Sequence, residues 1–147
     1  MSDHVRKQIR NAAKGASQGL GTTGDRVFVS RVYPLDKVKL PGLLIFTPAE
    51  DSAREDSPTD LMRDMTLQVH GVVRISENLE DELDDIALEV EQALDALGTA
   101  DLAKIYHGIQ GTVSTLEGGD VDKPHGAIAM DFLYTYRTVS GAPDVAV

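Results

Sequence analysis

The residues in this sequence best suited to binding a metal or moving a proton are four histidines, His4, His70, His107 and His125. No two of them lie four positions apart, and the zinc-protease pattern H-E-x-x-H is absent. We expect His70 to face solvent from the polar side of a strand, and His125, which follows Pro124, to lie in a loop. A nucleophile–histidine–acid triad gathers in space rather than in sequence, so the sequence leaves that class of enzyme open.

The carboxylates offer no clearer site. Asp84 and Asp85 are adjacent in a predicted helix, so their side chains point about 100° apart and do not share a proton. The segment DVDKPHG (120–126) begins like a calcium-binding EF-hand loop but lacks the later ligands and the terminal glutamate. The segment GTTG (21–24) ends a predicted helix instead of opening one, which disfavours a phosphate cradle. The sequence therefore predicts no catalytic residue, no metal site and no cofactor.

The composition describes one acidic domain. The 147 residues are 41% hydrophobic and 26% charged, with a formal net charge of −10, which disfavours nucleic-acid binding through phosphate neutralisation. The chain has no cysteine, so a disulfide scaffold and thiolate chemistry are excluded. No apolar run approaches the roughly 20 residues of a membrane span, and the start, MSDHVRKQIRNAAKG, lacks the apolar stretch of a signal peptide. These features fit synthesis in the cytoplasm and no contact with a membrane.

Hydrophobic periodicity predicts the elements that would position any site. In chain order they are a helix at 3–18 capped by Ser2 or Asp3, strands at 26–32, 43–46 and 65–75, a helix at 76–97, a short helical segment at 99–108, and strands at 109–119 and 127–139. The strand at 65–75 alternates apolar and polar residues, which indicates a sheet covered on one side. Consecutive strands with helices grouped elsewhere predict a single α+β domain over residues 1–147. Its sheet is mostly antiparallel or mixed, with the helices packed on one face.

Two segments contain few apolar residues or no periodicity. TPAEDSAREDSPTD (47–60) has five acids and two prolines, and we expect it to form an exposed, mobile acidic loop. The tail SGAPDVAV (140–147) is expected to be loose. In the short helical segment at 99–108, Leu102 and Ile105 are expected to point inward.

The charge pattern is the strongest functional feature of the sequence. The helix at 76–97 carries nine acidic residues and no basic one, and the helix dipole favours only those in its first turn, by roughly 0.3–1 kcal/mol each. A solvated helix face is one interpretation. The other is assembly, because a basic stripe on the first helix and acidic surfaces elsewhere suit a head-to-tail ring. The residues predicted to contact another subunit or a partner are Arg6, Arg10 and Lys14 on the first helix, Asp81, Asp84, Asp85, Glu89 and Glu91 on the acidic helix, and Glu50, Asp51, Glu55 and Asp56 in the acidic loop.

The order and character of four segments resemble the tail terminator proteins of long-tailed bacteriophages, the family of phage lambda's minor tail protein U. The segments are the opening helix VRKQIRNAAKG, then VFVSRVYPLDKVKLPGLLIF with Leu40–Pro41 before a strand, then LQVHGVVRISENLEDELDDIALEVEQAL, and the closing strand GAIAMDFLYTYRTV. The resemblance covers about residues 3–138 and contains no invariant short motif. The long acidic segment at 47–60 departs from the family pattern.

The resemblance implies a structural virion protein and not an enzyme. Such a protein forms a hexameric ring on the head-proximal end of the tail tube, made of the major tail tube protein, where it stops polymerisation and provides the surface for the head–tail connector. DNA passes through the ring without specific binding, and acids of the helix at 76–97 would face the lumen or a neighbour's basic stripe. The alternatives are a head-completion or neck protein of the same particle, and a metal-dependent hydrolase.

Overall fold

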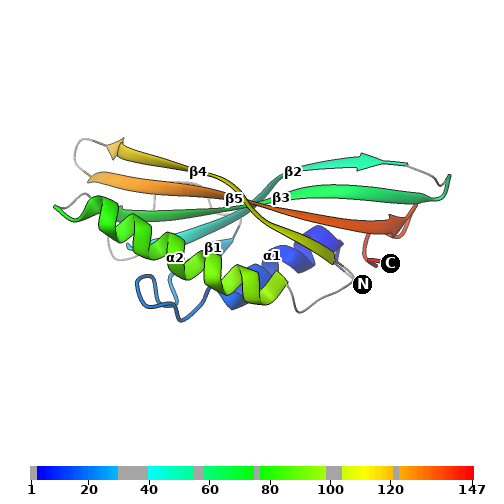
Figure 1. Ribbon diagram of the computed structural model, residues 1–147, viewed down its shortest axis with the longest axis horizontal. Helices are drawn as coiled ribbons and strands as arrows, with labels where there is room; N and C mark the ends of the chain where they lie inside the picture. Colours follow the sequence, from blue (N-terminus) through cyan, green and yellow to red (C-terminus); the bar gives the residue numbers. More distant parts are fainter. Residues whose placement is uncertain (1–2, 30–39, 55–57, 75–76, 99–103, 121–122) are drawn as a thin grey trace.

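The computed structural model describes residues 3–29, 40–54, 58–74, 77–98, 104–120 and 123–147. Its elements are α1 (Val5–Ala16), β1 (Val27–Val29), β2 (Gly42–Ala53), β3 (Asp60–Arg74), α2 (Leu79–Gly98), β4 (Lys104–Asp120) and β5 (Lys123–Val139). The strands form one mixed sheet in the order β1-β2-β3-β5-β4, in which β1 is parallel to β2 and the other neighbours are antiparallel. Both helices lie on the same side of this twisted sheet (Figure 1). The predicted fold class, a single α+β domain, is confirmed.

The centre of the sheet is formed by β3 and β5, whose alternating residues were predicted correctly. Met65, Leu67 and Val69 pair in register with Tyr134, Phe132 and Met130, and all six side chains are buried on the helix side. Burial of one such side chain contributes about 1.5–3 kcal/mol. These two long strands therefore anchor the core and fix which residues reach each face of the sheet.

The helix α2 lies along this core through Leu83, Ile86, Val90 and Leu94, which recur every three or four residues and are all buried. It approaches β3 closely at Gly71, where an added Cβ would lie 2.7 Å from Cγ2 of Ile86. Asp81, Asp84 and Asp85 of α2 are thereby left exposed on the side away from this core, as the sequence pattern predicted.

The helix α1 packs through Val5, Ile9 and Ala13, again at helical spacing. Its N-cap is His4, whose Nδ1 accepts a hydrogen bond from the backbone N of Arg6 at 3.1 Å. The prediction that Ser2 or Asp3 caps this helix is wrong for Asp3, and Ser2 lies outside the described residues. A neutral imidazole has one unprotonated ring nitrogen, so it accepts the amide proton as an aspartate would.

The acidic segment 47–60 is not a loop over most of its length. Residues 47–53 continue β2, and β3 begins at Asp60, so the two strands form a long hairpin (Figure 1). The register extends to Ala53 paired with Met62, after an irregularity between Phe46 and Ala49. Backbone pairing with β3 sets the structure here, and this pairing is not visible in the apolar content of the segment. Glu55 and Asp56 lie outside the described residues.

The segment 99–108 is likewise not helical where the structure describes it. Residues 104–108 are the start of β4, which runs through the strand predicted at 109–119. Gly108 has a φ of 86°, a left-handed conformation that an α-helix excludes. Ile105, expected to point inward, is 55% exposed, whereas Leu102 lies outside the described residues. Of the strand predicted at 26–32, residues 27–29 form β1, Arg26 precedes the strand, and residues 30–32 lie outside the described residues.

The tail after β5 is tied to the domain, contrary to the prediction of a loose end. The backbone N of Val5 donates to the carbonyl of Pro143 at 2.9 Å, and Val147 N donates to the carbonyl of Arg137 at 2.9 Å. The side chain of Gln8 also donates to the carbonyl of Asp144 at 2.8 Å. These bonds hold the tail beside the start of α1 and the end of β5.

Candidate functional site

The basic stripe predicted on α1 is largely used within the chain. Arg6 Nη1 lies 3.1 Å from Oε2 of Glu50 on β2, and Arg10 Nη1 donates to Oγ1 of Thr47 at 2.7 Å. Lys14 is half-buried on the same helix. Two of the three cations predicted to meet a neighbour therefore fix α1 to the outer part of β2.

Glu50, predicted as an exposed interface acid, is instead buried. Its side chain is 5% exposed, and Oε2 also lies 3.1 Å from Nη1 of Arg63, which is itself only 12% exposed. The hydroxyl of Tyr136 donates to its other oxygen, and Arg63 Nε donates to Oγ1 of Thr138 at 2.9 Å. Glu50 was misplaced because its burial depends on Arg6, Arg63 and Tyr136, which come from three other elements. A buried charge must be paired, and these donors provide the pairing.

Burial and the hydrogen bond to Glu50 raise the pKa of the Tyr136 hydroxyl above its usual value. The phenol consequently stays protonated and acts as a donor. The cluster Glu50–Arg6–Arg63–Tyr136 links α1, β2, β3 and β5 through these contacts. We assign it a structural role.

The acidic face of α2 divides into two groups. Glu89 binds the turn after α1, because its oxygens accept from the backbone N of Thr22 at 3.1 and 3.2 Å and from its hydroxyl at 3.1 Å. Asp95 accepts from the hydroxyl of Tyr106 at 2.6 Å. The helix dipole does not explain why these two acids lie beyond the first turn of α2, whereas their hydrogen bonds within the chain do. Glu89 therefore has hydrogen-bond partners within its own chain, and its contact with another subunit stays a prediction.

The other predicted acids of α2 remain on the surface. Asp81, Asp84 and Asp85 are exposed, and Glu91 is partly exposed. Leu88, 56% exposed, lies among them on the helix. Asp51 on β2 is also exposed, and its partner across the strands is another aspartate, Asp64. These carboxylates lie on both faces of the molecule, since α2 covers one face of the sheet and Asp51 and Asp64 point to the other.

Two chains of polar side chains cross the uncovered face of the sheet. In one, Thr135 Oγ1 donates to Oδ1 of Asp64 at 2.7 Å and lies 2.8 Å from Nε2 of His107. The order is unlike a catalytic triad, in which the histidine lies between the nucleophile and the acid. Here the hydroxyl lies between them and donates its hydrogen bond to the carboxylate, so the three side chains do not have the order of a triad.

The second chain runs from His70 through Gln68 to Asp131. His70 Nε2 lies 2.7 Å from Oε1 of Gln68, whose amide donates to Asp131 at 2.8 Å. His70 also meets the ring of Phe46 edge to face at 5.2 Å. Burial lowers the pKa of His70 from its usual value, and the Asp131 carboxylate opposes that shift. The predicted solvent-facing histidine is thus half-buried within a surface network.

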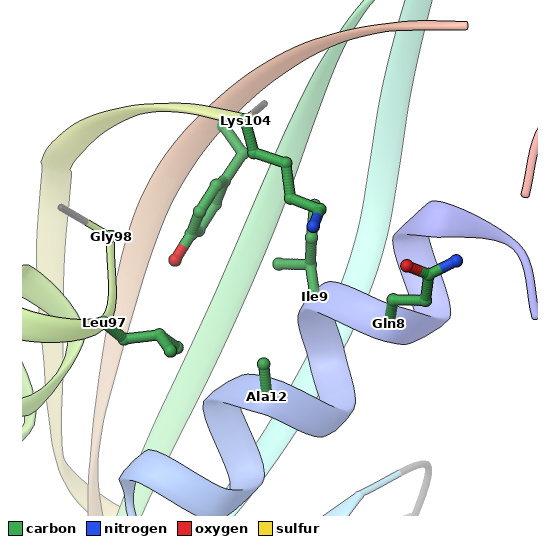
Figure 2. Close-up of a pocket in the computed structure, with 7 residues that line it drawn as sticks. Gln8, Ile9, Ala12, Leu97, Gly98 and Lys104 are labelled. Atoms are coloured by element: carbon green, nitrogen blue, oxygen red, sulfur yellow. The ribbon is translucent and has the colours of Figure 1, made fainter. Parts of the chain in front are cut away.

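A small cavity lies between the two helices and the ends of β4 and β5 (Figure 2). It measures about 50 Å³ and is lined by Gln8, Ile9, Ala12, Leu97, Gly98, Lys104 and Tyr134. This volume suits one or two water molecules and is well below the roughly 300–1,000 Å³ of small-molecule sites. The close-up shows Gln8, Ile9 and Ala12 of α1 on one side and Leu97 with Gly98 on the other. The cavity is best described as a gap in helix packing.

The most distinctive surface is the outer side of β4. Residues 105–116 contain no Asp, Glu, Lys or Arg, the longest such stretch in the chain. Among the described residues β4 pairs only with β5, so the backbone of its other side is open; we call residues 104–115 on that side the β4 edge. Two of its large apolar side chains are exposed, Ile105 and Val113, the latter by 68%. Natural sheets usually protect an edge with charges, so an uncharged edge of this length favours pairing with another chain.

A shallow depression of about 480 Å³ adjoins the start of this edge on the uncovered face. It is lined by Asp60, Met62, Ile105, Thr135, Tyr136, Arg137 and Val147. Apolar walls from Met62, Ile105 and Val147 with a polar rim resemble the composition of a protein contact. This surface was not predicted from the sequence, although the uncharged stretch at 105–116 is a signal for it.

The sheet has a second open edge. β1 covers only Leu43, Leu44 and Ile45 of β2, so in the part of the chain that the structure describes residues 49–53 have no neighbour on the side away from β3. We call this the distal β2 edge. It differs from the β4 edge, since it carries Asp51 and follows Pro48 and the irregularity between Phe46 and Ala49.

Comparison of the sequence with models of known protein families and with curated proteins finds no match. Within the described residues, no group of three or more His, Asp or Glu side chains could hold a metal ion. No helix in the same part of the chain is long and apolar enough to cross a membrane.

Proposed function

We propose that this chain is a tail terminator of a long-tailed bacteriophage. It forms a ring on the head-proximal end of the tail tube, stops addition of further tube subunits, and presents a different surface to the head–tail connector. The open, uncharged β4 edge carries the proposal, because a strand edge without charges is a surface suited to pairing with another polypeptide. The resemblance of four sequence segments to that family supports the same function.

The arrangement of the sheet supports a ring. Its two open edges lie on opposite sides of the molecule and differ in composition, so a copy of the chain presents unlike surfaces to its two neighbours. Contacts between unlike surfaces repeat around an axis and close when the rotation allows it. A single self-complementary patch would instead stop at a dimer.

The charge distribution supports the passage of DNA through such a ring. Exposed carboxylates lie on α2 and, through Asp51 and Asp64, on the opposite face of the sheet. Whichever face lines the lumen therefore presents acids to the phosphates. With a net charge of −10 per subunit, the lumen would repel the DNA backbone and not retain it.

Electron microscopy of the purified protein mixed with tail tubes of its own phage tests the proposal. We expect ring-shaped density at one end of each tube, and tube growth that stops when the protein is added to polymerising subunits. Tubes that lengthen unchanged, with bare ends, would reject the function. Binding to the connector or portal and not to tubes would instead favour a head-completion or neck protein.

A further inference from the structure

We propose that the β4 edge of one copy pairs with the distal β2 edge of the next copy, so that one antiparallel sheet continues from subunit to subunit. This inference rests on the proposed function for its biological setting. The strand pairing itself involves copies of this chain alone and is tested separately.

Strand direction permits the contact. β2, β3, β5 and β4 alternate in direction across the sheet, so β2 and β4 run oppositely. A second copy placed beside the first, with the same face outward, brings its β2 antiparallel to β4. Antiparallel strands pair without any change in either fold, and the helices of all copies remain on one side of the combined sheet.

The two edges also lie at the same level of the sheet. Lys104 pairs with Tyr136, Tyr136 with Arg63, and Arg63 with Ser52. The next row runs from Ile105 through Thr135 and Asp64 to Asp51 by the same pairings. Copies set side by side therefore bring the start of β4 against the end of β2 without a large shift along the strands.

Charge favours this pairing over the approach of other surfaces. Each copy is strongly acidic, and most exposed regions would set carboxylate against carboxylate. The uncharged stretch at 105–116 brings no carboxylate to Asp51 of the neighbour, and Lys104 is the charged residue at its start. Ile105 and the apolar walls of the adjoining depression would leave water on contact, which favours association.

Cysteine cross-linking tests the contact directly, because the chain has no cysteine of its own. Ile105→Cys is combined in three separate variants with Ala49→Cys, Asp51→Cys or Ala53→Cys. These three positions alternate along β2 and are exposed. They cover registers that differ by two residues, and one-residue shifts would reverse the faces. Within one chain Ile105 and Asp51 are three strand spacings apart, about 14 Å, which is too far for a disulfide.

We expect at least one double variant to form, under mild oxidation, a ladder of dimers, trimers and larger species, while each single variant forms no more than dimers. The matched control joins Ile105→Cys with Leu88→Cys, an equally exposed residue on α2, and should give no ladder. A ladder that is absent from all three double variants overturns the inference. Efficient dimers from Ile105→Cys alone, without a ladder from the double variants, would show pairing between two β4 edges and also overturn it.

A second measurement does not depend on disulfide geometry. Ile105→Lys places a charge on the β4 edge at an exposed position, so the monomer should fold normally while self-association weakens at least ten-fold by native mass spectrometry or sedimentation. Leu88→Lys is the control and should associate like the wild type. Association unchanged by Ile105→Lys rejects the strand pairing.

The outcomes separate this inference from the proposed function. Rings on tail tubes without a ladder would leave the tail terminator function intact and reject the strand pairing. A ladder with bare tube ends would retain the pairing and reject the function. A protein that neither associates nor binds tubes would reject both.

Discussion

The buried carboxylate of Glu50 gives the clearest prediction about what holds this fold together. Replacing Glu50 by alanine removes the acceptor for Arg6, Arg63 and Tyr136. Loss of one partner from a buried ion pair costs about 3–5 kcal/mol, mainly because the remaining charge is left without compensation. Arg6 is 39% exposed and regains water, so most of the effect should come from Arg63. We therefore expect Glu50→Ala to lower the free energy of unfolding by about 3 kcal/mol.

The size of this effect is measured by urea unfolding at pH 7, followed by far-UV circular dichroism. Glu50→Gln keeps an acceptor of similar shape but loses the charge, so it should lose about 1–2 kcal/mol. The control is Asp51→Ala at the next residue, which is exposed and faces Asp64 across the strands. It should change stability by no more than about 0.5 kcal/mol, or raise it slightly by removing a repulsion. A loss below about 0.5 kcal/mol for Glu50→Ala would refute the assigned structural role.

A second variant identifies the cause of the loss. If the unpaired guanidinium of Arg63 destabilises Glu50→Ala, then adding Arg63→Met should recover part of the stability, because the buried charge disappears. The double-mutant cycle is expected to give a coupling of about 1–2 kcal/mol between the two positions. Additive losses would contradict this explanation and would indicate that packing, not charge, dominates.

Three further predictions concern other parts of the fold. Gly71→Ala should lower the unfolding free energy by about 1–3 kcal/mol, because its Cβ would lie 2.7 Å from Ile86. Gly15 on α1 has open space beside it, so Gly15→Ala should raise the unfolding free energy by roughly 0.5–1 kcal/mol. Glu89→Ala should cost about 1–2 kcal/mol and speed hydrogen exchange of the amide that it binds in the turn after α1. The pKa of His4 is lowered by burial and by a nearby arginine, and that of His70 by burial. Both unfolded histidines therefore take up protons before the folded ones, so the stability they contribute is complete above about pH 6.5 and falls as the pH drops below that value. A stability that stays constant between pH 7 and 5.5 would contradict this expectation.

The sequence predicted the elements whose apolar residues repeat with a regular period. In α2, β3 and β5 the buried face is formed by residues only two to four positions apart. The local sequence pattern is therefore enough to predict both the type of element and its buried face. Met65, Leu67 and Val69 on β3 illustrate this, because each alternates with a polar residue and each is buried. Local spacing was sufficient because these elements lie against one continuous core.

The sequence did not predict elements that depend on a distant strand. Residues 47–53 contain little that is apolar, and they form a strand because β3, itself paired with β5, extends beside them. At the start of β4 a short helix was predicted in place of a strand, because its apolar residues are spaced three apart, as on one side of a helix. Its pairing with the end of β5 overrides that weak local preference. Hairpin length and edge position are set by such pairings, and no local pattern reports them.

The candidate interface shows the same limit in a different way. Charged residues were expected to form the contact between subunits. Arg6, Glu50 and Glu89 instead make ion pairs or hydrogen bonds within their own chain. Asp81, Asp84 and Asp85 of α2 keep their charge on the surface, where it repels copies of the same protein more than it attracts them. In an acidic protein the surface best able to join two copies is therefore one without charge, and among the described residues that surface is the β4 edge.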